Sequence, residues 1–116
     1  MILELNGCIV PKARPRVTRS GHAYMPSGYR DWKDNASFDL AQQTQERALE
    51  GVSIDVCLVG KHNRRGDADN VSGAILDALV DANILRDDNM KCVRRLTVEL
   101  IYSAEDPRTI IEIKPL

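Results

Sequence analysis

Residues 66–88, GDADNVSGAILDALVDANILRDD, decide how the rest of this chain is arranged. The apolar residues of this stretch recur at helical offsets, and they are Val71, Ala74, Ile75, Ala78, Leu79 and Ala82. That stripe predicts a core-facing amphipathic helix that begins near Asp69 and stops at Asn83.

Acidic pairs flank this helix on both sides. Asp67 and Asp69 are one residue apart, so in an extended segment they project to the same side. Asp87 and Asp88 follow the helix stop, where the chain must turn. Periodicity leaves open whether that turn brings the second pair back to the first.

The first acidic pair has two interpretations. Asp69 can cap the helix by accepting bonds from the N–H groups of residues 71 or 72, with Asp67 solvated. Alternatively, the aspartates form a site for Mg²⁺, a hard cation that prefers carboxylate oxygens. The spacing alone does not choose between these two interpretations.

Composition indicates an ordinary globular chain with segregated charge. The 116 residues are enough for a single domain, residues 1–116, and 43% of them are hydrophobic and 28% charged. The net charge of −1 conceals three basic clusters, at Lys12, Arg14, Arg16 and Arg19, at Lys61, Arg64 and Arg65, and at Arg94 and Arg95. Each cluster is either a solvated face or part of a surface that binds a polyanion.

The cysteines and the hydropathy pattern point to the cytoplasm. Cys8, Cys57 and Cys92 are odd in number, lack metal-ligand spacing and lie in apolar runs, which predicts free, buried thiols in a reducing compartment. No signal-peptide pattern and no apolar run approaching ~18 residues is present, so we expect neither export nor insertion into a membrane.

Alternation and turn residues predict the other elements. They are strands at 2–10, 52–59, 92–102 and 109–114, and an earlier helix from Ser27, a possible cap, to about Glu50. Residues 11–28 and 60–66 are expected to be basic loops. The order βαβαββ predicts an α+β fold with a small mixed sheet of four strands packed with two helices. The last two strands are expected to form an antiparallel hairpin, with the side chains of Leu96, Val98, Leu100 and Tyr102 directed inward.

Clustered carboxylates between basic loops suit phosphodiester hydrolysis. Carboxylates brought together repel one another unless a cation compensates them. A divalent ion can activate a water molecule, neutralise charge developing on phosphorus and hold the leaving oxygen. Lysines and arginines on the neighbouring loops would bind the flanking phosphates.

The segment RRGDADNVSGAILDAL, followed after a short connection by DD, resembles the RusA family of Holliday-junction resolvases, small endodeoxyribonucleases of bacteria and their phages. The early segment PKARPRVTRSGHAYMP resembles the basic N-terminal segment of that family. The resemblance implies a homodimer that depends on Mg²⁺, with Mn²⁺ as an alternative. Such an enzyme acts on branched DNA in recombination and repair, and cuts four-way junctions by symmetric paired nicks.

The resemblance also implies roles for individual residues. Asp67, Asp69 and Asp88 would be the metal-binding and catalytic carboxylates, with Asp87 supporting Asp88. Asn70 would support the metal site or contact DNA, and Asp77 is a weaker candidate on the same helix face. The side chains expected to bind DNA phosphates are Lys12, Arg14, Arg16, Arg64, Arg65 and Lys61.

One position departs from the family pattern. Where the family usually carries a lysine, four residues after the second motif aspartate, this chain has Gly73. Lys61 or Lys91 would then have to supply the missing cation. Otherwise the protein binds junctions but cuts them poorly, or it is an α+β interaction protein whose acidic motif is only a cap. His22 and His62 are interpreted as solvent-exposed or DNA-facing rather than as general bases.

Overall fold

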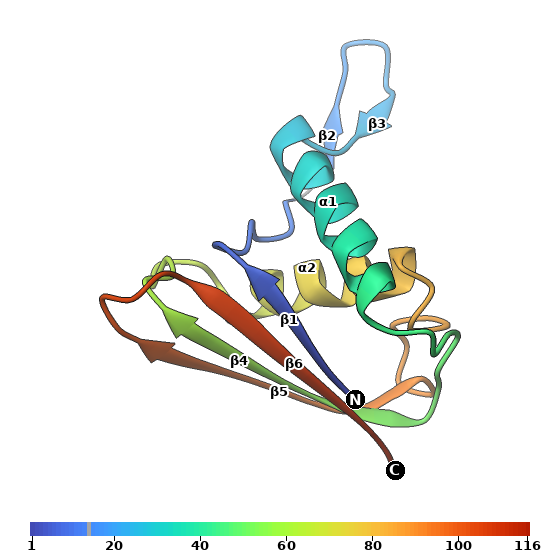
Figure 1. The fold of residues 1–116 in the computed structure, drawn as a ribbon. Coiled ribbons are helices and arrows are strands. Elements are labelled where there is room, and N and C mark those ends of the chain that lie inside the picture. Colours follow the sequence, from blue (N-terminus) through green and yellow to red (C-terminus); the bar gives the residue numbers. More distant parts are fainter. Residues whose placement is uncertain (14) are drawn as a thin grey trace.

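Two helices cover one face of a four-stranded mixed sheet, which confirms the predicted α+β class (Figure 1). The computed structural model describes residues 1–13 and 15–116. The elements are β1 (Ile2–Asn6), β2 (Arg16–Val17), β3 (Ala23–Tyr24), α1 (Ser27–Gln43), β4 (Val52–Gly60), α2 (Ala68–Asp81), β5 (Val93–Tyr102) and β6 (Arg108–Pro115).

The strand order of the sheet is β1-β6-β4-β5, so the predicted hairpin of the last two strands is wrong. β4 pairs in parallel with β5 and antiparallel with β6, and these two strands therefore lie on opposite sides of β4. The loop that connects β5 to β6 is hydrogen-bonded to the end of β4. Ser103 N–H donates to the carbonyl of Gly60 at 3.2 Å, and Lys61 N–H donates to the carbonyl of Glu105 at 2.9 Å.

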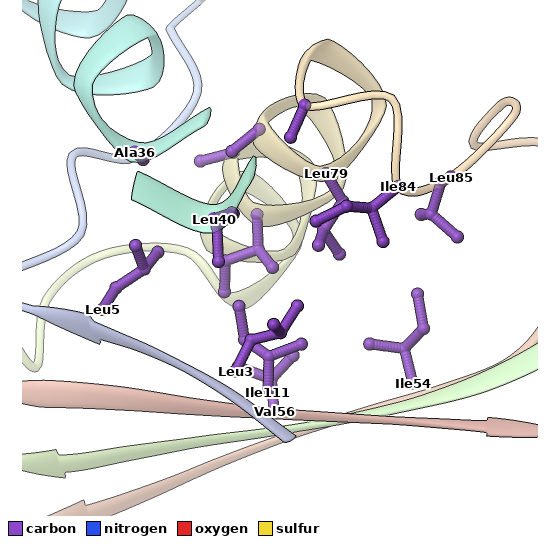
Figure 2. Packing of buried hydrophobic residues seen from close by; sticks show 14 of the residues in the cluster. Leu3, Leu5, Ala36, Leu40, Ile54, Val56, Leu79, Ile84, Leu85 and Ile111 are labelled. Atoms are coloured by element: carbon purple, nitrogen blue, oxygen red, sulfur yellow. The ribbon is translucent and has the colours of Figure 1, made fainter. Parts of the chain in front are cut away.

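The core lies between the helices and the inner face of the sheet, as Figure 2 shows. β4 alternates as predicted from Ile54 onward, with Ile54 and Val56 buried and the intervening Asp55 half-buried, whereas Ser53 on the opposite side is also buried. The apolar stripe of α2 is also confirmed, since its members are all buried. Complete burial of each large aliphatic side chain contributes roughly 1.5–3 kcal/mol, so this stripe holds α2 against the sheet.

β5 is more exposed than its alternation predicts. Leu96, Leu100 and Tyr102 keep 37%, 39% and 41% of their surface exposed, and only Val98 packs partly against the core. Leu96 and Leu100 pair with buried β4 residues, so they do point to the inner side of the sheet. Because β5 is an edge strand that the helices do not cover, its inner side is not buried.

The first helix and strand are shorter than predicted. α1 ends at Gln43 rather than near residue 50, and Thr44 is already extended. The Arg47 guanidinium donates to the carbonyl oxygens of Ala41 and Thr44, which occupies acceptors at the helix end. At the start of α1, Pro26 is the N-cap residue and no side chain caps the helix, so Ser27 has no capping role. β1 stops at Asn6, before a turn.

The early basic loop contains a small hairpin that the pattern did not predict. β2 and β3 pair antiparallel, with Arg16 opposite Tyr24, and both side chains are exposed. Figure 1 shows this hairpin beyond the first turn of α1, away from the main sheet.

The cysteines are free, as predicted, but differ in burial. Cys92 is buried and Cys57 is half-buried, whereas Cys8 is exposed, contrary to the prediction. Among the residues that the structure describes, no helix combines the length and apolar character needed to cross a membrane.

Candidate functional site

The first acidic pair occupies the beginning of α2. Asp67 is the N-cap residue, but its side chain makes no cap hydrogen bond, and its carbonyl accepts from Val71 N–H at 3.0 Å. Asp69 lies inside the first turn, where its Oδ1 accepts from Asn70 N–H at 3.0 Å. The interpretation of Asp69 as the helix cap is therefore wrong. Both carboxylates are exposed at the positive end of the helix dipole.

The second acidic pair sits in a turn that Asp87 organises. Asp87 Oδ1 accepts from the backbone N–H of Asp88 at 2.7 Å, and its Oδ2 accepts from Asn89 Nδ2 at 3.1 Å. Asp88 itself is exposed, and no side-chain hydrogen bond to it occurs within the described residues. Asp87 thus holds the backbone of the turn and leaves the carboxylate of Asp88 facing solvent.

The two acidic pairs lie along different parts of α2. A pocket of about 230 Å³ joins Asp87 and Asp88 to the later half of the helix, and it is lined by Lys33, Asp77, Val80, Asp81, Asp87 and Asp88. Asp77 is about 12 Å further along the helix than Asp69, at ~1.5 Å per residue. Over residues 1–13 and 15–116, no group of three or more potential ligand side chains is close enough to hold a metal ion. The structure therefore does not bring Asp67, Asp69 and Asp88 together.

The chemistry of the three carboxylates nevertheless suits a hard cation. Carboxylate oxygens are preferred ligands of Mg²⁺. Within the described part of the chain, none of the ion pairs involves Asp67, Asp69 or Asp88. All three side chains are exposed. Their oxygens are accordingly accessible to an incoming ion.

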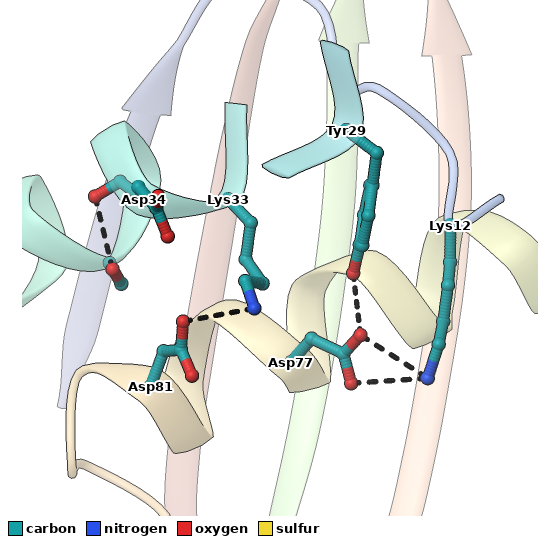
Figure 3. Close-up of polar contacts among 7 residues, drawn as sticks. Lys12, Tyr29, Lys33, Asp34, Asp77 and Asp81 are labelled. Carbon is teal, nitrogen blue, oxygen red and sulfur yellow. Dashed lines mark hydrogen bonds and ion pairs between the residues drawn. The ribbon is translucent and has the colours of Figure 1, made fainter. Parts of the chain in front are cut away.

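Asp77 is the polar centre between the two helices (Figure 3). Lys12 Nζ lies 3.3 Å from Asp77 Oδ1 and 3.2 Å from Oδ2, and the Tyr29 hydroxyl donates to Oδ2 at 2.5 Å. Burial, and then the bond to Asp77, raise the pKa of Tyr29 well above its usual range, so the phenol remains a donor. Both Lys12 and Asp77 were candidates from sequence, but their pairing across 65 residues was not predictable.

A second, basic pocket lies at the loop before α2. It has a volume of about 690 Å³ and is lined by Cys8, Lys61, His62, Asn63, Arg64, Arg65 and Tyr102. The Arg64 guanidinium carbon lies 4.0 Å from the centroid of the Tyr102 ring, a cation–π contact that no local sequence signal indicated. Three predicted phosphate-binding side chains, Lys61, Arg64 and Arg65, thus share one pocket.

Of the two histidines, His62 is buried and His22 is exposed. His62 is only 5% exposed and its Nε2 is 2.8 Å from the carbonyl oxygen of Arg108, so the prediction of an exposed imidazole is wrong there. His22 and Arg16 are exposed. Arg14, another predicted phosphate-binding residue, lies outside the described residues.

Comparison with known proteins gives a match over nearly the whole chain. Residues 6–114 match the family described as Endodeoxyribonuclease RusA. A relative from Aquifex aeolicus (strain VF5), named Crossover junction endodeoxyribonuclease RusA, is 26% identical over 115 residues, which cover 97% of this chain and 90% of the relative. The match includes both acidic pairs and the helix between them. The chain therefore belongs to the RusA family of endodeoxyribonucleases.

Proposed function

We propose that this chain is a Mg²⁺-dependent, structure-selective endonuclease that resolves four-way (Holliday) junctions by symmetric paired nicks. The observation that carries the proposal is the exposed Asp67–Asp69 pair at the start of α2 in a chain of the RusA family. The name of the Aquifex relative refers to crossover junctions, which supports the same substrate. The proposed setting is DNA recombination and repair in the cytoplasm of a bacterium, with a host or phage gene as the source.

The proposed metal ligands are Asp67, Asp69 and Asp88, with Mn²⁺ as an alternative to Mg²⁺. A bound ion would supply an activated water molecule and neutralise charge on the phosphate. Asp87 would stabilise the conformation of the turn that carries Asp88, through its hydrogen bonds to Asp88 and Asn89. Because the bonds that Asp87 makes lie within this turn, we propose that the turn shifts as a unit when the ion and DNA bind.

The proposed DNA contacts surround these carboxylates. Lys61, Arg64 and Arg65 share the basic pocket, while Lys12 lies against α2 and Arg16 is exposed on the β2–β3 hairpin. Arg14 belongs to the same proposal from its position in the sequence. Such side chains would bind phosphates and set the orientation of the junction without reading its sequence. Asn70, in the first turn of α2, would contact either DNA or the metal site.

A homodimer is the assembly that this activity requires, because the two nicks must be related by symmetry. Its support is the exposed apolar side of β5, where Leu96 and Leu100 are exposed on an edge strand. Leu100→Asp should shift the protein from dimer to monomer in light scattering after size exclusion. Phe38→Asp, at an exposed apolar residue on α1, is the control that should leave the mass unchanged. A Leu100→Asp protein that stays dimeric would place the interface elsewhere.

The nuclease proposal is tested with a synthetic four-way junction. The wild-type protein should nick it symmetrically in Mg²⁺ and not in EDTA, and Asp69→Asn should lose cleavage while remaining folded. Asp31→Asn, at an exposed aspartate of α1, is the matched control and should cleave normally. Cleavage that survives EDTA or Asp69→Asn would reject this chemistry.

Gly73 supports a second candidate function. A protein of this fold without a helix-borne lysine at position 73 could bind junctions and cut them poorly or not at all. It would show tight, salt-sensitive binding without nicking in either Mg²⁺ or Mn²⁺.

A further inference from the structure

Gly73, in the middle of α2, is covered by a side chain from a distant segment. A Cβ added to Gly73 would lie 3.2 Å from Cδ of Lys12 and 3.7 Å from its Cβ, and these are the atoms it would meet within 4 Å. The 3.2 Å contact is tighter than ordinary van der Waals contact. The missing side chain of Gly73 therefore makes the space through which the stem of Lys12 passes.

Lys12 is fixed at both of its ends. Its backbone N–H donates to the carbonyl of Asn70 at 2.9 Å, and its ammonium binds both oxygens of Asp77, as Figure 3 shows. The preceding Pro11 lies against the loop just before α2, since its Cγ would be 3.5 Å from a Cβ on Gly66. These contacts hold the 11–12 segment along the first half of the helix.

This placement lays the Lys12 side chain along α2, from the residue that follows the first acidic pair to the pocket that holds the second. Asn70, which anchors the backbone of Lys12, directly follows Asp69 in the first turn of α2. Asp77, which binds the ammonium, lines the same pocket as Asp87 and Asp88. The Lys12 side chain keeps 42% of its surface exposed, so an incoming phosphate can reach it.

We propose that Lys12 supplies, from the N-terminal segment, the cation that α2 lacks at Gly73, and that its ammonium contacts a DNA phosphate during cleavage. The inference rests on the proposed nuclease function and assigns a further residue to it. Asp77 and Tyr29 are then positioning residues, because Asp77 holds the ammonium and Tyr29 holds Asp77. Neither Lys61, in the basic pocket, nor Lys91, in the turn after Asp88, is among the contacts of position 73.

Lys12→Met tests this role because it removes the charge and retains most of the stem. We expect the single-turnover rate at saturating protein and Mg²⁺ to fall about 100-fold, the order seen when one charge-stabilising donor is removed. Junction affinity should fall far less. Lys114→Met removes an ion-paired lysine on β6, and it should leave the rate unchanged. Wild-type rates in a folded Lys12→Met protein would overturn the assignment.

A double variant separates charge placement from structural support. Lys12→Ala combined with Gly73→Lys removes the stem that the new side chain would meet and returns the cation to α2, and it should recover most of the rate lost in Lys12→Ala. A merely structural role for Lys12 predicts no recovery, because Gly73→Lys fills the space above the helix without rebuilding the contacts of the segment. No recovery in a folded double variant would therefore contradict the proposal.

Lysine acetylation followed by mass spectrometry gives a readout that does not need cleavage. With the junction bound in EDTA, Lys12 should lose most of its reactivity while Lys114 keeps its own. If the wild-type protein binds junctions but never nicks them, the nuclease proposal fails. The phosphate contact of Lys12 is then judged only by whether the bound junction protects Lys12 from acetylation. Unchanged reactivity of Lys12 in a bound complex would rule out the phosphate contact even if cleavage is normal.

Discussion

The hydroxyl of Tyr29 donates a hydrogen bond to Oδ2 of Asp77 over 2.5 Å and so joins α1 to α2. The Tyr29 ring is buried and stacks against Trp32, with ring centroids 6.2 Å apart. The same carboxylate binds Lys12 from the N-terminal segment. One half-buried aspartate therefore ties together three separate parts of the chain.

Tyr29→Phe should lower the free energy of unfolding by about 1.5–3 kcal/mol, the range for a hydrogen bond to a charged group. The ring still fills its space, so the loss reports the bond alone. Urea denaturation measures it. Tyr24→Phe changes an exposed tyrosine of the β2–β3 hairpin, and it should alter stability by less than about 0.5 kcal/mol. Equal stabilities for the two variants would contradict this account.

The Tyr29 phenol should also make stability depend on pH in the alkaline range. Its pKa in the folded protein is raised, chiefly by burial and then by the bond to Asp77. Below the unfolded-state pKa of about 10, both states hold the proton and the stabilisation is fully present. Above it, the unfolded chain releases a proton that the folded chain keeps, so the free energy of unfolding falls as pH rises. The stability gap between wild type and Tyr29→Phe should therefore shrink above about pH 10. A constant gap between about pH 8 and about pH 11 would show that the phenol titrates normally.

Gly60→Ala should destabilise the fold strongly. Gly60 has φ +99°, and an added Cβ would lie 2.6 Å from the carbonyl oxygen of Asp106, in the loop between β5 and β6. Backbone strain and this collision together should remove about 3 kcal/mol or more, measured by thermal or urea denaturation. Gly28→Ala, in the first turn of α1, meets nothing within 4 Å and is the matched control. We expect it to be neutral or to stabilise by up to about 1 kcal/mol. A mild effect at Gly60 would mean that the loop can move away from the end of β4.

Arg64→Gln should weaken binding to an uncut junction in EDTA. It removes one charge from the basic pocket, so the slope of log affinity against log salt should fall by about one. Fluorescence anisotropy across several salt concentrations measures both quantities. Lys114→Gln removes one charge from β6, outside the pocket, and should change neither. An unchanged slope for Arg64→Gln would exclude a phosphate contact there.

The elements that the sequence predicted best are those that other elements cover on their apolar side. The stripe of α2 and the alternation of β4 were both confirmed, since each lies at the centre of the fold. β5 alternates equally well, yet Leu96 and Leu100 stay exposed. Alternation identifies which side of a strand faces the helices, but it does not tell whether a helix covers that strand.

The candidate site was predictable in its parts and not in its assembly. The position of Asp67 and Asp69 at the start of α2 followed from the helix period. The pairing of Lys12 with Asp77 and the stacking of Arg64 on Tyr102 join segments that are distant in the chain. Such contacts depend on how the loops pass along α2 and past the end of the sheet, for which a single sequence carries no signal.

By itself, the sequence determined the helix that carries the acidic motif, the central strand, the α+β class and the likeness to the RusA family. These features arise from side-chain periods and spacings within a few residues, which backbone geometry converts directly into faces. Only the tertiary structure decided that β5 and β6 flank β4, that the second acidic pair lies against the later half of α2, and that Lys12 crosses Gly73. The physical reason is that strand order and loop crossing depend on the packing of the whole chain. A backbone that reverses between elements can bring the same local segments together in several ways.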